Sequence, residues 1–142
     1  MPPPIYVNTD LEAILLEVRK AIREYFGRDP GEADAIFVRT RRDILGYVEP
    51  GSRIIRINVE TYRKYIEAEG PEASTEYLFV IILHEYLHIM GIYDEREVRR
   101  ISMEIAERVF GKHSRAMKIA ESLADPRDIF IKRIGRLLSP YI

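Results

Sequence analysis

The chain has 142 residues, of which 46% are hydrophobic and 32% are charged, and its formal net charge at pH 7 is −1. A chain of this length is expected to form one domain, residues 1–142, that buries about two-thirds of the surface of the unfolded chain. The balanced charge gives no support to nucleic-acid binding. Because the chain contains no cysteine, a disulfide framework and a thiolate metal site are both excluded.

Neither the N-terminal residues nor the apolar runs of the chain predict a signal peptide or a membrane span. Residues 1–4 are Met-Pro-Pro-Pro, which lack the basic region and apolar region of a signal peptide. The longest apolar run is far below the roughly 18–20 residues that a membrane span needs. We therefore expect a cytoplasmic protein without a membrane partner. The absence of glutamine, the two asparagines and the many charges are typical of a thermophilic protein.

The first predicted element is a helix that begins after Thr9. Thr9 is expected to be its N-cap, with Glu12 three residues later in the position of a capping-box glutamate. Apolar residues then recur at helical spacing until Gly27, which is expected to end the helix.

Three strands and a short helix are expected next. The strand residues are rich in isoleucine and valine, and Pro50-Gly51 between the last two strands favours a type II turn and therefore a hairpin-like connection. The predicted strands are residues 35–39, 44–48 and 53–59, and the helix is residues 60–69.

The second half of the chain is predicted to be helical, so the fold class is α+β with a small mixed sheet. The helix that contains the run Tyr77 to Leu83 is apolar nearly all round and should be the central buried helix. The predicted helices are residues 72–90, 94–110, 114–124 and 127–138.

A metal-binding motif, His84-Glu85-Tyr86-Leu87-His88, lies within the predicted buried helix. Residues four apart on an α-helix differ by about 40° in azimuth and roughly 6 Å along the axis, so both imidazoles can reach one Zn²⁺. Glu85 is turned roughly 100° from His84, which places its carboxylate beside the metal, where it could act on a water as general base. Without such a partner, two histidines and a glutamate would be costly to bury.

The motif and the residues after it resemble the signature of a family of zinc peptidases, the metzincins. From His84 to Asp94 the chain reads H-E-x-x-H-x-x-G-x-x-D, where metzincins have histidine last. The resemblance implies a zincin-like fold, a sharp turn at Gly91 and a third zinc ligand at Asp94, as in the snapalysin-type peptidases. Met103 is a possible counterpart of the metzincin methionine turn, although a core methionine is favoured.

A second resemblance, to the gluzincins and the short archaeal minigluzincins, gives further candidates for the third ligand. In those proteins the ligand is a glutamate on a helix after the motif helix, which here implies Glu95, Glu97 or, less favourably, Glu104. Asp94 would then be the N-cap of that helix. We expect Asp94 to be the ligand, and Glu95 and Glu97 are the next candidates.

The expected function is that of a zinc-dependent peptidase acting on a peptide or protein, with His84, His88 and Asp94 as metal ligands and Glu85 as the catalytic base. A metal-dependent endoribonuclease is a second hypothesis, because H-x-x-x-H-x-x-G-Y-D-H in the rRNA-maturation metalloproteins is similar. A third is a latent peptidase. A fourth is a non-catalytic module, in which zinc would have a fourth protein ligand such as His113.

Three further hypotheses concern the surroundings of the motif. In zincins, a sheet edge beside the cleft binds extended substrate by strand addition, and one of the predicted strands could do so here. The segment 127–138 could cover the cleft as a lid. The Tyr93 hydroxyl could stabilise an oxyanion, although a tyrosine packed on the sheet is favoured.

Overall fold

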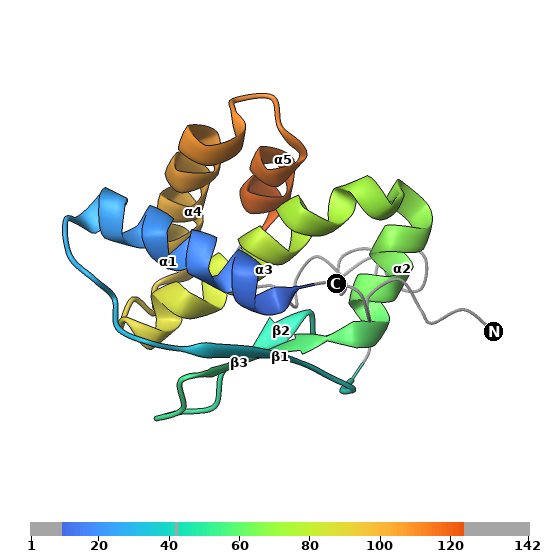
Figure 1. Cartoon of the computed structure of the whole chain (residues 1–142), viewed down its shortest axis with the longest axis horizontal. Helices are drawn as coiled ribbons and strands as arrows, with labels where there is room; N and C mark the ends of the chain where they lie inside the picture. The colour runs from blue at the N-terminus through green and yellow to red at the C-terminus, as the bar shows by residue number, and fades with distance from the viewer. Residues whose placement is uncertain (1–9, 42, 124–142) are drawn as a thin grey trace.

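The computed structural model describes residues 10–41 and 43–123, which form an α+β fold with a mixed three-stranded sheet and a helical C-terminal half (Figure 1). The predicted fold class is therefore confirmed. In chain order the elements are α1 (Leu11–Phe26), β1 (Asp34–Val38), β2 (Gly46–Tyr47), β3 (Ile54–Asn58), α2 (Val59–Glu69), the 3₁₀ turn η2 (Pro71–Ala73), α3 (Ser74–Ile89), α4 (Glu95–Phe110) and α5 (Arg115–Ser122). The predicted helix at 127–138 lies outside the described residues.

Helix α1 is capped by the residues immediately before and after it, Asp10 and Gly27. Asp10 is the N-cap, since its carboxylate accepts a hydrogen bond from the backbone N–H of Ala13 at 3.0 Å. The predicted cap, Thr9, is one residue too early, because the carboxylate that satisfies a free amide of the first turn is that of Asp10. Gly27 ends the helix with φ 73°, as predicted.

The sheet has the strand order β1-β3-β2, with β1 parallel to β3 and β2 antiparallel to β3. The predicted hairpin-like connection between the last two strands is confirmed, but β2 is only two residues long. The buried side chain of Asn58 bonds to the segment before β2, since its Nδ2 donates to the carbonyl oxygens of Arg41 (2.9 Å) and Ile44 (2.8 Å). Asn58 thereby holds the loop that leads into β2.

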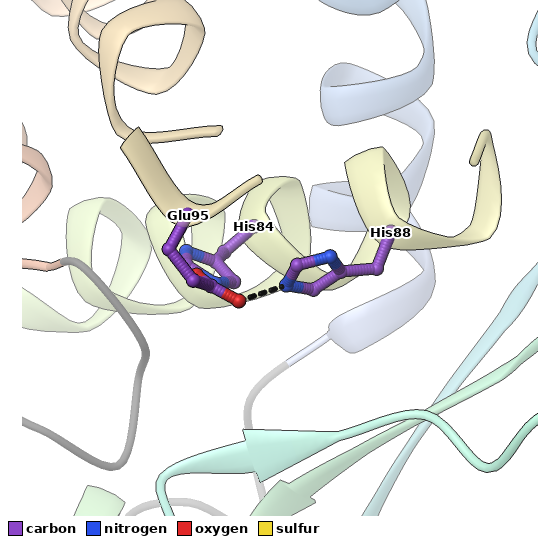
Figure 2. Close-up of side chains that lie close together, drawn as sticks. All are labelled: His84, His88 and Glu95. Atoms are coloured by element: carbon purple, nitrogen blue, oxygen red, sulfur yellow. Dashed lines mark ion pairs between the residues drawn. The ribbon is translucent and has the colours of Figure 1, made fainter. Parts of the chain in front are cut away.

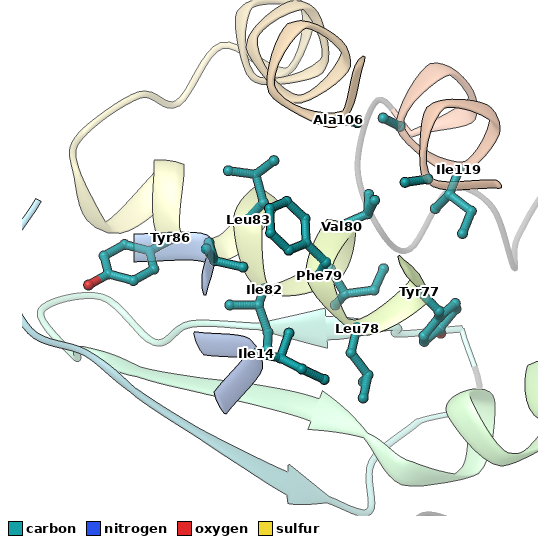
Figure 3. Close-up of a cluster of buried hydrophobic side chains, with 14 of the residues drawn as sticks. Ile14, Tyr77, Leu78, Phe79, Val80, Ile82, Leu83, Tyr86, Ala106 and Ile119 are labelled. Atoms are coloured by element: carbon teal, nitrogen blue, oxygen red, sulfur yellow. The ribbon is translucent and has the colours of Figure 1, made fainter. Parts of the chain in front are cut away.

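Helix α3 is the centre of the fold. Together with α1 it covers one face of the sheet, and α4 and α5 pack on its other side (Figure 1). Figure 3 shows Leu78 and Ile82 pointing toward the sheet, and Val80 and Leu83 pointing toward α4 and α5. Every residue from Tyr77 to Leu87 is buried, which confirms the predicted central helix. None of the helices in the described part of the chain is long and apolar enough to cross a membrane.

Candidate metal centre

Two imidazoles lie one helical turn apart near the C-terminal end of α3. The ring centroids of His84 and His88 are 4.8 Å apart. The His84 side chain is 1% exposed and that of His88 is 19% exposed, so the pair lies at the boundary between the core and the surface. The four-residue spacing of the motif thus brings both rings to one side of the helix, as the helical period requires.

The turn after α3 fixes the orientation of the His88 ring. Gly91 has φ 95°, a left-handed conformation that glycine adopts without steric cost. The backbone N–H of Ile92 donates to the carbonyl of Leu87 at 3.1 Å, which closes a Schellman-type helix end. The carbonyl oxygen of Ile92 then lies 2.9 Å from Nδ1 of His88. Because a carbonyl only accepts, Nδ1 carries the proton and Nε2 is directed away from the turn.

The third member of the group is Glu95, the first residue of α4. Its Oε2 lies 3.0 Å from Nε2 of His84, and its Oε1 lies 3.1 Å from Nε2 of His88 (Figure 2). One donor atom from each of the three residues falls within 4.8 Å of the others, a grouping compact enough to hold a metal ion. The three side chains come from two helices that meet across the turn at Gly91.

Asp94, the preferred third ligand in the sequence, lies next to this group but its carboxylate is used elsewhere. It is the N-cap of α4, where its Oδ1 accepts from the backbone N–H groups of Arg96 (2.9 Å) and Glu97 (3.4 Å). An N-cap carboxylate turns toward the amides of its own helix, and the next residue is then the first that can extend toward α3. The carboxylate that lies beside the histidines is therefore that of Glu95, one of the two next candidates for the third ligand.

The two remaining candidate glutamates of α4 face an arginine instead of the histidines. The carboxylate of Glu97 is paired with the guanidinium of Arg100, and that of Glu104 lies 3.2 Å from Nη1 of the same residue. Neither belongs to the group formed by His84, His88 and Glu95.

The donor set fits a divalent cation such as Zn²⁺. Both nitrogens of His88 face oxygen acceptors, Nδ1 the Ile92 carbonyl and Nε2 the Glu95 carboxylate. With the single proton of a neutral imidazole on Nδ1, the Nε2 lone pair would face the carboxylate, an arrangement that either a second proton on the ring or a metal ion between the two groups would stabilise. Donor atoms about 2.0–2.2 Å from a tetrahedral zinc lie about 3.3 Å from one another, close to the separations seen here.

Glu85 follows His84 on α3 and lies close to strand β2 of the sheet. Its side chain is buried, with 5% of the residue exposed. Strand β2 passes close to it: a Cβ atom on Gly46 would lie 3.9 Å from Cγ of Glu85 and only 2.9 Å from Cγ2 of Ile81. Only glycine therefore permits this approach of β2 to α3. Gly46 was not among the candidate residues in the sequence, although a glycine within a predicted strand is a signal of close backbone approach.

The remaining candidate residues from the sequence do not belong to the group formed by His84, His88 and Glu95. Tyr86 is buried and its hydroxyl donates to the carbonyl of Gly31, and burial raises the pKa of this hydroxyl. Met103 packs against the core, as favoured, and His113 is exposed and outside the metal-binding group. Tyr93 is 74% exposed, so the expectation that it packs on the sheet is wrong.

No protein-family model, no sequence of a curated protein and no solved structure matches this chain significantly. The resemblance to zinc peptidases therefore rests on the motif from His84 to Asp94 and on the grouping of two histidines with a glutamate.

Proposed function

We propose that the protein is a metal-dependent hydrolase of peptide bonds, with Zn²⁺ as the native ion and a peptide or protein as the substrate. The observation that carries this proposal is the carboxylate of Glu95, whose two oxygens each lie within 3.1 Å of Nε2 of one histidine. His84, His88 and Glu95 would hold the ion. Among residues 10–41 and 43–123, no fourth histidine or acid joins them. This open position favours a catalytic over a structural metal.

The chain's own catalytic group in this proposal is Glu85. A bound zinc ion would polarise the scissile carbonyl and make water more acidic. The Glu85 carboxylate accepts a proton from the attacking water and delivers it to the leaving amine, which keeps the proton balance of hydrolysis. Its position next to the histidines in sequence, but on a different side of α3, suits a group that acts beside the ion without binding it.

Strand β2 gives the proposed site a surface for an extended substrate. It is the outermost strand in the order β1-β3-β2, and within the described residues it pairs with β3 alone. A peptide could add to its outer edge by main-chain hydrogen bonds. Since Gly46 brings this strand against Ile81 and Glu85, such a peptide would run beside the general base.

The test of this function is the Glu85→Gln variant, measured for zinc content and for cleavage of a mixture of fluorogenic peptides. We expect one zinc per chain in both proteins and at least a 100-fold loss of turnover in the variant, the usual scale of general acid–base catalysis. Glu107→Gln, which changes an exposed glutamate of α4, is the matched control and should keep full activity.

Cleavage of RNA but not of peptides by the zinc-loaded protein would replace this proposal with that of a nuclease. Zinc binding without hydrolysis of any peptide would favour a latent peptidase or a non-catalytic module. Undiminished peptide hydrolysis by Glu85→Gln would refute the role of Glu85.

A further inference from the structure

Tyr93 occupies a short connection whose backbone is held on both sides. On one side, Ile92 donates its N–H to Leu87 and offers its carbonyl to Nδ1 of His88. On the other side, Asp94 caps α4 through two backbone N–H groups. The position of the Tyr93 backbone is therefore determined by the same turn that orients the candidate metal ligands.

The Tyr93 side chain projects from this fixed backbone into the solvent. It is 74% exposed, the most exposed of the large hydrophobic residues in the described part of the chain. Its ring is nearly parallel to that of His88, with an interplanar angle of 11° and 6.4 Å between centroids. Its hydroxyl forms no hydrogen bond with any residue that the structure describes. An exposed aromatic ring at the edge of a proposed active site is a surface available to a ligand.

The charged groups around Tyr93 indicate the chemistry of that ligand. Asp94 is bonded to two amides, Glu95 faces both histidines, and Glu97 is paired with Arg100. Each of these carboxylates already has at least one partner within the protein. What remains accessible is the face of the tyrosine ring, which favours an apolar or aromatic side chain.

We propose that Tyr93 contacts the substrate and selects a large apolar side chain close to the scissile bond. This inference rests on the proposed peptidase function and gives it a substrate class. Tyr93 is here a specificity-determining residue, which contributes its ring to substrate binding. Its hydroxyl has no part in the proton transfer assigned to Glu85.

The experiment uses the zinc-loaded full chain and three variants: Tyr93→Ala, Tyr93→Phe and, as a control, Leu16→Ala. Leu16 is 56% exposed and lies on α1, a different helix from the one that carries the motif. A fluorogenic peptide library first identifies the preferred cleavage site. Two peptides are then compared that differ only in a phenylalanine or an alanine beside that site.

We expect the protein to prefer the phenylalanine peptide, and Tyr93→Ala to lower kcat/KM for that peptide about 10-fold, mainly through KM, the scale of one apolar contact. The parent protein and Tyr93→Ala should cleave the alanine peptide with almost the same kcat/KM. Tyr93→Phe and Leu16→Ala should retain the preference, and all four proteins should bind one zinc.

Equal preference in the parent protein and Tyr93→Ala would overturn the inference while leaving the peptidase function intact. A loss of kcat in Tyr93→Phe as large as in Tyr93→Ala would also overturn it, because the hydroxyl would then be the active group. A parent protein with bound zinc and no peptidase activity would overturn the proposed function and this inference together.

Discussion

Three of the four glutamates of helix α4 contact other side chains in two different ways. Glu97 and Glu104 share the guanidinium of Arg100, and the hydroxyl of Tyr25 on α1 donates to Glu104. Glu95, at the first position of the helix, faces two imidazoles of α3. The first arrangement is complete as it stands, since each carboxylate meets a cation or a hydroxyl donor. The second is a grouping that could also hold a metal ion, since two imidazoles and a carboxylate are metal ligands.

In the first arrangement, the pKa values of Arg100 and Glu104 are shifted in the direction that favours their charged forms. The hydrogen bond from Tyr25 and the nearby charge of Arg100 lower the pKa of Glu104 below its ordinary value. In return, the bonds with Glu97 and Tyr25 raise the pKa of Arg100. Arg108 adds a cation–π contact, with its guanidinium carbon 5.0 Å from the centroid of the Tyr25 ring. The same residue type on one helix thus takes part either in an ion-pair network with Arg100 of the same helix or in a candidate metal centre with the histidines of α3.

The largest expected effect that separates the two arrangements comes from neutralising their carboxylates. Glu95→Gln should weaken zinc binding at least about 100-fold, since an amide oxygen is a poorer ligand than a carboxylate. Glu97→Gln, two residues later, should leave the zinc affinity unchanged. Titration with zinc in competition with a chelator measures both constants. Equal affinities in the two variants would remove the distinction between the arrangements.

A smaller effect is expected from changing Asp94, and it shows whether this residue is a helix cap or a metal ligand. Asp94→Ala should lower the free energy of unfolding of the metal-free protein by about 1 kcal/mol, the usual value of an N-cap, and leave zinc affinity nearly unchanged. Asp94→Asn is the matched control, because asparagine also caps helices well and should restore the stability. Urea unfolding and zinc titration provide the two readouts. A large loss of zinc affinity in Asp94→Asn would make Asp94 the ligand after all.

The smallest expected effect is the pH dependence contributed by Glu104. Its pKa is lower in the folded state, so its stabilising contribution is present above the ordinary value of 4.5 and is lost as the pH falls through the folded pKa. Since the side chain is 45% exposed, we expect a contribution of about 0.5 kcal/mol or less. Urea unfolding of the parent protein and Glu104→Gln should therefore differ most near pH 6 and converge toward pH 3. A difference that does not change between these pH values would contradict the assignment.

The central helix and two of the three residues of the candidate metal centre could be predicted from the sequence because they depend on local periodicity. The apolar run before His84 predicts burial all round, and a spacing of four predicts that His84 and His88 lie on one side of a helix. The separate strands and the α+β class follow in the same way from patterns and turn residues. The boundary of α1 was missed by one residue because Thr9 and Asp10 are both good caps.

The identity of the third residue could not be determined from the sequence, since it depends on the angle at which α4 leaves the turn. Asp94 and Glu95 are adjacent, and which of them reaches the histidines is decided by the left-handed conformation of Gly91 and by the use of Asp94 as a cap. The way the segment before β2 is held has a similar origin. It depends on Asn58, a side chain that bonds to carbonyls 14 and 17 residues away in sequence.

The most direct measurement of the central claim is the structure of the zinc-soaked protein with anomalous diffraction at the zinc edge. We predict one ion per chain, bound by Nε2 of His84, Nε2 of His88 and a carboxylate oxygen of Glu95, with solvent in the remaining position. An anomalous peak elsewhere, a fourth protein ligand on the ion, or no peak between the two imidazoles at saturating zinc would contradict the account.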